Sequence, residues 1–296
     1  MHDDGPAGGG LRLGGCSPRP IVVINTAHSG SRLLTRMLVD AGVHMGAGLP
    51  ETMDCVSLVP LVEKALMKAR GPIPNGEELD DPEIRSLAMQ LLSGHVAGIS
   101  GTQRWGWKLC ETLLIVPLIN HYFPQAVFVH LIRDGRDVAF SHFVGPKAPY
   151  WRKVYFGSQH IEAWRGFPMT QRANRAYGYL FNAERWRYHV TLARGFKEAL
   201  GSRYVEVRYE DLVRDNEATA RHLAAALQLP SLRPSDPADL NPGSIGKWRR
   251  QPQREIEAVN QIAGPLLLSL GYAETIGRAS PKHASFLDRL LLGGYF

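Results

Sequence analysis

The amino-acid sequence predicts an α/β fold with a mostly parallel central sheet that is flanked by helices. Short apolar runs typical of strands alternate with longer segments of helical periodicity. The run AVFVHLI, at residues 126–132, is almost continuously apolar, as expected of a strand that is covered on both faces. The 296 residues are enough to bury a substantial core. We expect one domain over residues 19–273, preceded by a disordered glycine-rich leader at 1–18 and followed by a tail at 274–296 that docks as a helix.

The first unit of the fold is a strand, a turn and a helix. Residues 21–24 are apolar and follow a proline, whereas residues 31–39 carry apolar side chains at helical spacing. The next segments are predicted from the same periodicity and from turn residues at their ends, including a proline in the first turn of one helix. They are helices at 58–70, 82–97 and 113–122, with a short strand at 104–109.

The second half of the chain continues this alternation after the strand at 126–132. The segment RDGRDVAFSHF turns from that strand into a helix at 134–143, so Arg133 lies at the strand end and Ser141 about two helical turns further along. Residues 150–167 are irregular, aromatic and basic. The remaining predicted elements are a long helix at 174–199, a strand at Tyr204–Arg208, and helices at 217–227 and 254–270.

Composition narrows the possible functions. The net charge of +6 favours an anionic ligand, but basic residues are dispersed among acidic ones, so we expect no nucleic-acid partner. The three cysteines, Cys16, Cys55 and Cys110, lack metal-ligand spacing, which argues against a zinc site or a disulfide framework. The N-terminal residues lack signal-peptide features and no segment has the length of a membrane span, so we expect a cytoplasmic protein.

The turn after the first strand, residues 25–30, suits an anion. Small residues at Ala27, Ser29, Gly30 and Ser31 let backbone N–H groups approach a ligand closely, and the positive end of the following helix dipole faces the same point. A phosphate is the expected occupant. The magnesium-dependent phosphate loop G-x-x-x-x-G-K-[ST] needs an early glycine and a lysine, and both are missing here.

Two stretches together resemble the sulfotransferases that use 3′-phosphoadenosine 5′-phosphosulfate (PAPS). The segment TAHSGSR, at residues 26–32, resembles the loop that binds the 5′-phosphosulfate end in that family. Arg133, followed eight positions later by Ser141, resembles the pair that binds the 3′-phosphate. Tyr209 in RYEDL, the segment GSIGKWRR at 243–250 and the helix GPLLLSLGY are similar to later segments of the family.

This resemblance implies a P-loop-like nucleotide-binding architecture. It also implies transfer of a sulfuryl group from PAPS to a hydroxyl or phenol of a small molecule, a glycan or a peptide, without a metal. Residues 150–167 would then either line the acceptor pocket or pack as core under a long loop. The residues that the resemblance assigns to PAPS are His28, Ser29, Gly30, Ser31, Arg32, Arg133, Ser141, Tyr209, Lys247 and Arg249.

The resemblance further points to two residues that stabilise the transferring and leaving groups. Lys108 lies 25 residues before Arg133, close to the spacing of the family's catalytic lysine. His28 stands where the family usually has lysine or arginine in the phosphate loop, and it can donate a hydrogen bond to the leaving phosphate.

The general base is the least determined role. The histidine of the family's Lys-x-His motif is replaced by Cys110, which is a poor proton acceptor unless its thiolate is stabilised. Glu51, about twenty residues past the phosphate loop, matches a glutamate of the protein-tyrosine and several bacterial sulfotransferases. Glu51 is therefore the first choice as base, and Asp54 and Glu111 are the alternatives.

Two other functions stay open from the sequence. A magnesium-dependent small-molecule kinase shares the strand, loop and helix and would also turn Arg133 toward a phosphate. A non-catalytic nucleotide-binding protein of the same fold would explain why His28 and Cys110 occupy positions where the family has catalytic residues.

Overall fold

The central sheet consists of four parallel strands in the order β2-β1-β3-β4. The computed structural model describes residues 10–68, 76–99, 101, 103–141 and 171–274. Within them the strands are β1 (Ile21–Asn25), β2 (Gly106–Lys108), β3 (Val127–Ile132) and β4 (Tyr204–Arg208). The predicted fold class, a parallel sheet flanked by helices in a P-loop-like arrangement, is confirmed.

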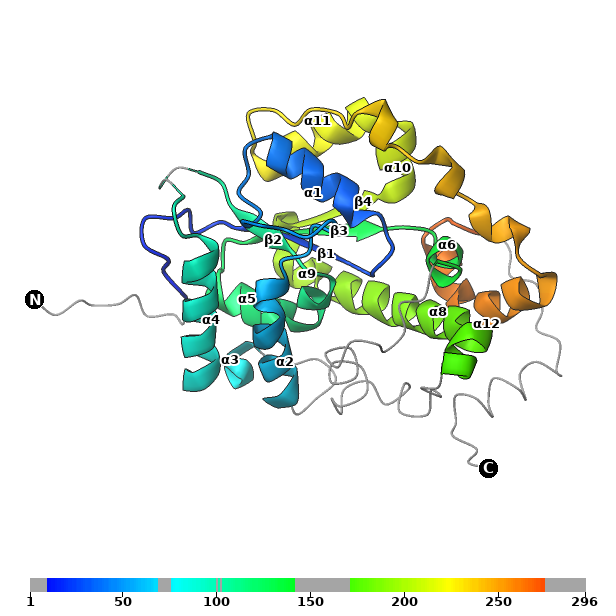
Figure 1. The fold of residues 1–296 in the computed structure, drawn as a ribbon, viewed down its shortest axis with the longest axis horizontal. Coiled ribbons are helices and arrows are strands. Elements are labelled where there is room, and N and C mark those ends of the chain that lie inside the picture. Colours follow the sequence, from blue (N-terminus) through cyan, green and yellow to red (C-terminus); the bar gives the residue numbers. More distant parts are fainter. Residues whose placement is uncertain (1–9, 69–75, 100, 102, 142–170, 275–296) are drawn as a thin grey trace, which may run out of the picture.

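Helices cover the sheet on both sides (Figure 1). One face carries α1 (Ser31–Asp40), α10 (Tyr209–Arg214) and α11 (Asn216–Leu227). On the other side, and along the carboxyl edge of the strands, lie α2 (Val59–Lys68), α3 (Gly76–Leu79), α4 (Pro82–His95), α5 (Val116–Tyr122), α6 (Gly135–Ala139), α8 (Gln171–Gly195), α9 (Lys197–Leu200) and α12 (Gln253–Ser269).

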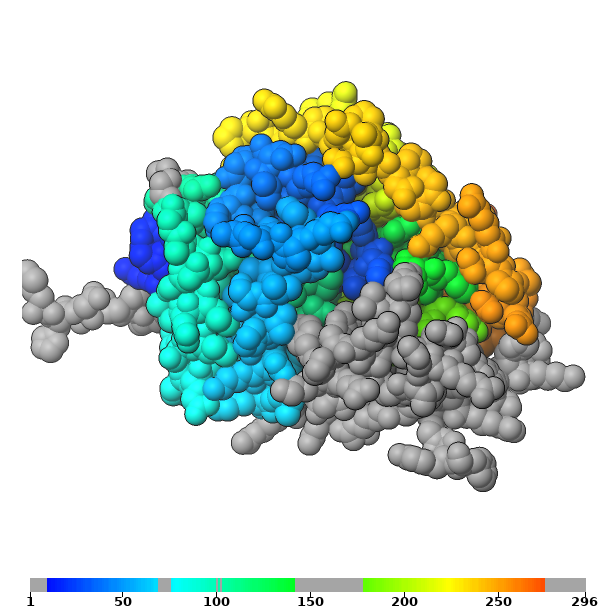
Figure 2. Space-filling view, viewed as in Figure 1, coloured from blue at the N-terminus to red at the C-terminus, as the bar shows by residue number. Residues whose placement is uncertain are grey.

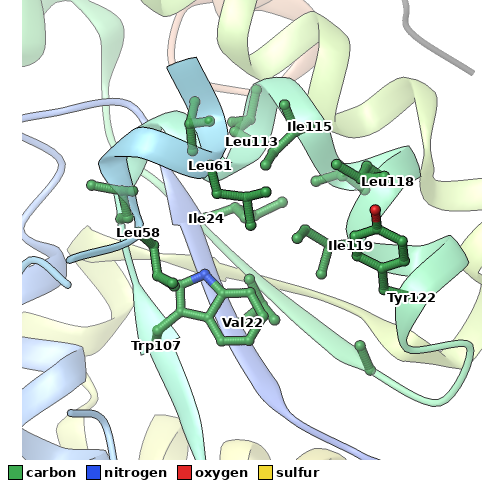
Figure 3. Packing of buried hydrophobic residues seen from close by; sticks show 14 of the residues in the cluster. Val22, Ile24, Leu58, Leu61, Trp107, Leu113, Ile115, Leu118, Ile119 and Tyr122 are labelled. Carbon is green, nitrogen blue, oxygen red and sulfur yellow. The ribbon is translucent and has the colours of Figure 1, made fainter. Parts of the chain in front are cut away.

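Alternation along the strands divides the core between these two layers. In β1, Ile21 and Val23 pack toward α1, whereas Val22 and Ile24 join the cluster under the opposite face. Figure 3 shows Val22 and Ile24 among side chains from α2, α5 and the turn between β2 and α5, with Trp107 beside them. All residues of β1, β2 and β3 are buried, which agrees with the mostly apolar sequences of β1 and β3.

The register of the strands determines which loops meet. Asn25 is paired with Leu131, and Ile132 is paired with Arg208. The residues that follow these pairs, Arg133 and Tyr209 among them, therefore emerge side by side at the carboxyl edge of the sheet. Ligands of open parallel sheets bind at this edge.

Several elements differ from the sequence expectations, among them α3, which lies where no helix was expected. The helix expected at 134–143 is shorter, because α6 ends at Ala139 and Ser141 lies beyond it. Helix α10 directly follows β4, where no helix was expected. In the segment 10–18, expected to be a disordered leader, Leu11 and Leu13 are buried and the backbone N–H of Leu11 donates to the carbonyl of Tyr122.

Two expectations lie outside the described residues: the role of the aromatic stretch 150–167 and the docking of the tail after residue 274. Among the described residues, no helix has the length and apolar character needed to cross a membrane.

Candidate active site

The turn at residues 25–30, which we call the phosphate loop after its expected ligand, is strained and tightly packed between β1 and α1. His28 and Gly30 both have left-handed backbone conformations, with φ of 72° and 87°. A Cβ atom at Gly30 would lie 2.3 Å from Cδ2 of Tyr209. Only glycine accommodates both the backbone conformation and this close approach to the aromatic ring, which explains the glycine in the sequence. Strain of this kind is typical of ligand-binding turns.

Three side-chain atoms of this loop are buried without a hydrogen-bond partner among the described residues. They are Oδ1 of Asn25, Oγ1 of Thr26 and Oγ of Ser29. Each costs free energy in the folded chain unless a ligand or solvent satisfies it. The hydroxyls of Thr26 and Ser29, together with the small-residue turn, can donate to the oxygens of a bound phosphate or sulfate group, whereas Oδ1 of Asn25 can only accept and needs a donor.

Arg133 connects the phosphate loop to the segment at 243–250, which we call the basic loop. Arg133 is 5% exposed, and its guanidinium donates hydrogen bonds to the carbonyl of His28 at 3.2 Å and to that of Ser244. It lies 4.5 Å above the ring of Tyr209, whose hydroxyl is 3.0 Å from Oγ of Ser244. Trp186 on α8 donates to the carbonyl of Arg133 at 3.0 Å. Arg133 is thereby held as a buried cation beside the phosphate loop.

Ser141 and the basic loop also meet. Nζ of Lys247 donates to Oγ of Ser141 at 2.8 Å. Burial and the nearby Arg133 lower the pKa of Lys247, so its ammonium lies in a partly desolvated place where an anion would be attracted. Figure 2 shows the segment that contains the basic loop, in yellow to orange, along one edge of the visible face between α11 and α12.

Lys108 lies in a second cluster, at the end of β2. Its side chain is only 3% exposed, and Nζ contacts Oδ1 of Asp54 at 2.7 Å and donates to the carbonyl of Thr52 at 2.6 Å. The backbone N–H of Cys55 donates to the carbonyl of Lys108 at 2.7 Å. Lys108 therefore fastens the acidic segment 51–55 to the sheet edge.

The candidate bases have different surroundings. Glu51 is 90% exposed and forms an ion pair of 2.8 Å with Arg32. Asp54 holds Lys108, and Glu111 is buried. Burial raises the pKa of the Cys110 thiol far above its usual range, so Cys110 stays protonated near neutral pH and is not a base. Asn25 donates to its sulfur at 3.3 Å.

The sequence-predicted residues that contact one another fall into four groups. The largest joins His28, Arg133 and Tyr209, and a second joins Ser141 and Lys247. The other two are the ion pairs of Arg32 with Glu51 and of Lys108 with Asp54. Arg249 is exposed and packs on Trp248, with its guanidinium carbon 4.6 Å from the ring centre. Sequence reasoning missed Ser244, although it lies within the quoted basic motif.

The fold and the site define an α/β protein whose parallel strands end at an edge where Arg133 and Lys247 gather. The sequence pattern of the sulfotransferase family matches residues 20–234, which is more than half of the chain. The chain therefore belongs to the sulfotransferase family, and the family predicted from the sequence is confirmed.

Individual relatives are distant. An uncharacterized protein of Aquifex aeolicus is 25% identical over 253 residues, which cover 79% of this chain and 31% of that protein. The chain thus spans about a third of the length of this curated relative. The sulfotransferase domain from the curacin biosynthetic pathway is 18% identical, with a TM-score of 0.48 and coverage of 85% of this chain and 98% of that one. A sulfotransferase from Alicyclobacillus acidocaldarius is 15% identical, with a TM-score of 0.49 and coverage of 87% and 97%.

Proposed function

We propose that this chain is an enzyme that moves a sulfuryl group from PAPS to a hydroxyl or phenol of a small molecule, a glycan or a peptide. The observation that carries this proposal is the buried Arg133, which bridges the phosphate loop and the basic loop at the sheet edge. PAPS carries two anionic ends. The phosphate loop and Arg133 with Ser141 offer two neighbouring places for them, and membership of the sulfotransferase family supports this assignment.

The binding residues proposed from the sequence have groups that suit the nucleotide. The loop residues 28–32 would hold the phosphosulfate end through backbone N–H groups and the hydroxyl of Ser29. Arg133, Ser141 and Lys247 would hold the 3′-phosphate, and Tyr209 would lie near the adenine. PAPS supplies the activated sulfuryl group when it is bound. The chain must then place cations and donors where charge develops.

Lys108 and His28 are the proposed groups for this charge. Lys108 is already desolvated, which strengthens its interaction with an anionic oxygen. It would exchange its contact with Asp54 for one with the transferring group. His28 would donate a hydrogen bond to the leaving phosphate. Glu51 is the proposed base, and its ion pair with the exposed Arg32 leaves it accessible to an acceptor.

Calorimetric titration with 3′,5′-adenosine bisphosphate, and separately with ATP and magnesium, tests the proposed donor. We expect micromolar binding of the bisphosphate and at least tenfold weaker binding by Arg133→Ala, because a charge-assisted contact of about 1.5–3 kcal/mol is lost. Arg250→Ala, an exposed change at the end of the basic loop, is the matched control for lost positive charge. A preference for ATP would contradict the proposal and favour a kinase.

The choice of base is tested by Glu51→Gln and Asp54→Asn. With a phenolic acceptor and saturating PAPS, Glu51→Gln should lower kcat by about 10²–10⁴-fold, which is the usual contribution of a general base. Binding of the bisphosphate should stay unchanged in this variant. If Asp54→Asn abolishes turnover while Glu51→Gln does not, Asp54 is the base instead. Binding without turnover by the unmodified chain on a panel of acceptors would favour a non-catalytic nucleotide-binding protein.

A further inference from the structure

The buried carboxylate of Asp137 lies under the basic loop. Asp137 belongs to α6 and is fully buried. Its Oδ2 accepts a hydrogen bond from the backbone N–H of Gly246 at 2.7 Å, and its Oδ1 accepts one from that of Trp248 at 3.1 Å. These two residues flank Lys247. One side chain thus binds the backbone on both sides of the lysine that contacts Ser141.

The main chain of Asp137 acts on the same place. Its carbonyl accepts a hydrogen bond from Oγ of Ser141 at 2.7 Å, and the same hydroxyl accepts one from Lys247 at 2.8 Å. Asp137 therefore fixes both partners of the Ser141–Lys247 contact, one through its backbone and the other through its carboxylate.

A negative charge is an unexpected component of a site that would bind phosphate. Burial raises the pKa of Asp137, whereas the two N–H donors and the charge of Arg133 lower it. A carboxylate here repels a bound anion, so anion binding alone does not explain why Asp137 is present. Its two hydrogen bonds to backbone N–H groups give an explanation, because they hold the basic loop against α6 before any nucleotide binds. The conformational entropy of the loop is then lost during folding and does not reduce the affinity for the nucleotide.

We propose that Asp137 is a positioning residue that holds the basic loop closed over the nucleotide site, with Lys247 directed at Ser141, in the ligand-free chain. Arg136 adds to this arrangement, since its guanidinium carbon lies 3.9 Å from the ring centre of Trp248. This inference rests on the proposed function for its consequence, which is tighter nucleotide binding. The docking of the loop itself is independent of that function.

The first experiment measures the loop without ligand. In Asp137→Asn, amide hydrogen exchange in peptides covering 243–250 should rise at least tenfold, because an NH2 group, which cannot accept a hydrogen bond, replaces one of the two carboxylate oxygens that accept from Gly246 and Trp248. Exchange in β1 and β3 should stay unchanged. Asp80→Asn, which removes a carboxylate that binds Arg85 and His121 away from this site, controls for general destabilisation. Unchanged exchange at 243–250 in Asp137→Asn would overturn the proposal.

The second experiment measures the nucleotide. Asp137→Asn should weaken binding of 3′,5′-adenosine bisphosphate about tenfold and raise KM for PAPS by a similar factor, with kcat within about threefold of the unmodified value. A merely structural role would not produce this split between KM and kcat. Equal binding by Asp137→Asn and the unmodified chain would also overturn the proposal.

Gly246→Ala is a second variant in case Asp137→Asn does not fold. Gly246 has a φ of 74°, and a Cβ there would lie 2.2 Å from a guanidinium nitrogen of Arg249, so the change disturbs the half-exposed loop and leaves the core intact. It should reproduce the faster exchange and the weaker binding, and the absence of both effects would contradict the proposal. If the unmodified chain binds no bisphosphate, the proposed function fails, and the exchange experiment still decides whether Asp137 anchors the loop.

Discussion

Gly30 carries two separate constraints at a single residue. Its φ is 87°, and the ring of Tyr209 occupies the space where a Cβ would be. Gly42, at the other end of α1, has a similar φ of 81° but no atom within 4 Å of its Cβ position. Comparing substitutions at these two glycines therefore distinguishes the effect of backbone strain from the effect of overpacking.

We predict that Gly42→Ala loses about 1–2 kcal/mol of unfolding free energy, from the left-handed conformation alone. Gly30→Ala should lose a further amount of about 1–3 kcal/mol, because Tyr209 must move. The bisphosphate affinity should fall in Gly30→Ala and not in Gly42→Ala, since Tyr209 also contacts Arg133 and Ser244. Urea unfolding and calorimetry measure both effects. Equal losses of stability in the two variants would contradict the prediction.

At the same scale, the sequence predicted which residue types gather at the sheet edge but not their partners. Arg133 was expected at the strand end, and the register of β3 and β4 places it there. The pairing of Lys108 with Asp54 was not predictable, because the two residues are 54 positions apart and both are common at solvated strand ends. The spacing of Arg133 and Ser141 could be recognised in the sequence. Nothing in the sequence distinguished Asp137, which lies between them, from other acidic residues.

At the scale of elements, strands were predicted more accurately than helices. The strand Tyr204–Arg208 was predicted with its exact bounds, because its alternation and its neighbouring turn residues agree. Helix α10 was missed because it is only six residues long and begins directly after the strand, which leaves no turn signal.

Helix α6 shows why helix length was harder to predict. The apolar spacing of VAFSHF fits a longer helix, but α6 ends at Ala139, and Ser141 just beyond it contacts Lys247, which is 106 positions away in the sequence. Such long-range contacts are invisible to local periodicity. Ser141 therefore lies just past the end of α6, where it contacts Lys247 of the basic loop.

At the scale of the whole molecule, buried neutral histidines make stability depend on pH. Burial lowers the pKa of His130 to about 3 and also lowers the pKa of His189 well below its usual value. In the unfolded chain both histidines titrate near ~6.5. Below that pH the unfolded state binds more protons than the folded state. The free energy of unfolding is therefore highest above about pH 6.5 and decreases as the pH falls.

We predict a loss of about 1.4 kcal/mol per pH unit for each of these histidines below about pH 6. Urea unfolding between pH 7.5 and 5 measures the slope. The hydroxyl of Tyr204 lies 2.6 Å from Nδ1 of His130, and His130→Gln retains a polar group beside it. This variant should reduce the slope by about 1.4 kcal/mol per pH unit, which corresponds to one proton. A slope that does not change in this variant would show that His130 titrates normally in the folded protein.

The contacts of Arg133 also bear on how the chain folds. This single side chain joins residue 28 to residue 244, so the proposed anion site combines segments from nearly opposite ends of the described chain. Contacts of such high sequence separation form late, because the intervening loop must close first. The proposed anion site is then completed late when the chain refolds. A nascent chain that ends before residue 243 contains all four described strands but lacks Ser244 and Lys247, which the proposed site needs.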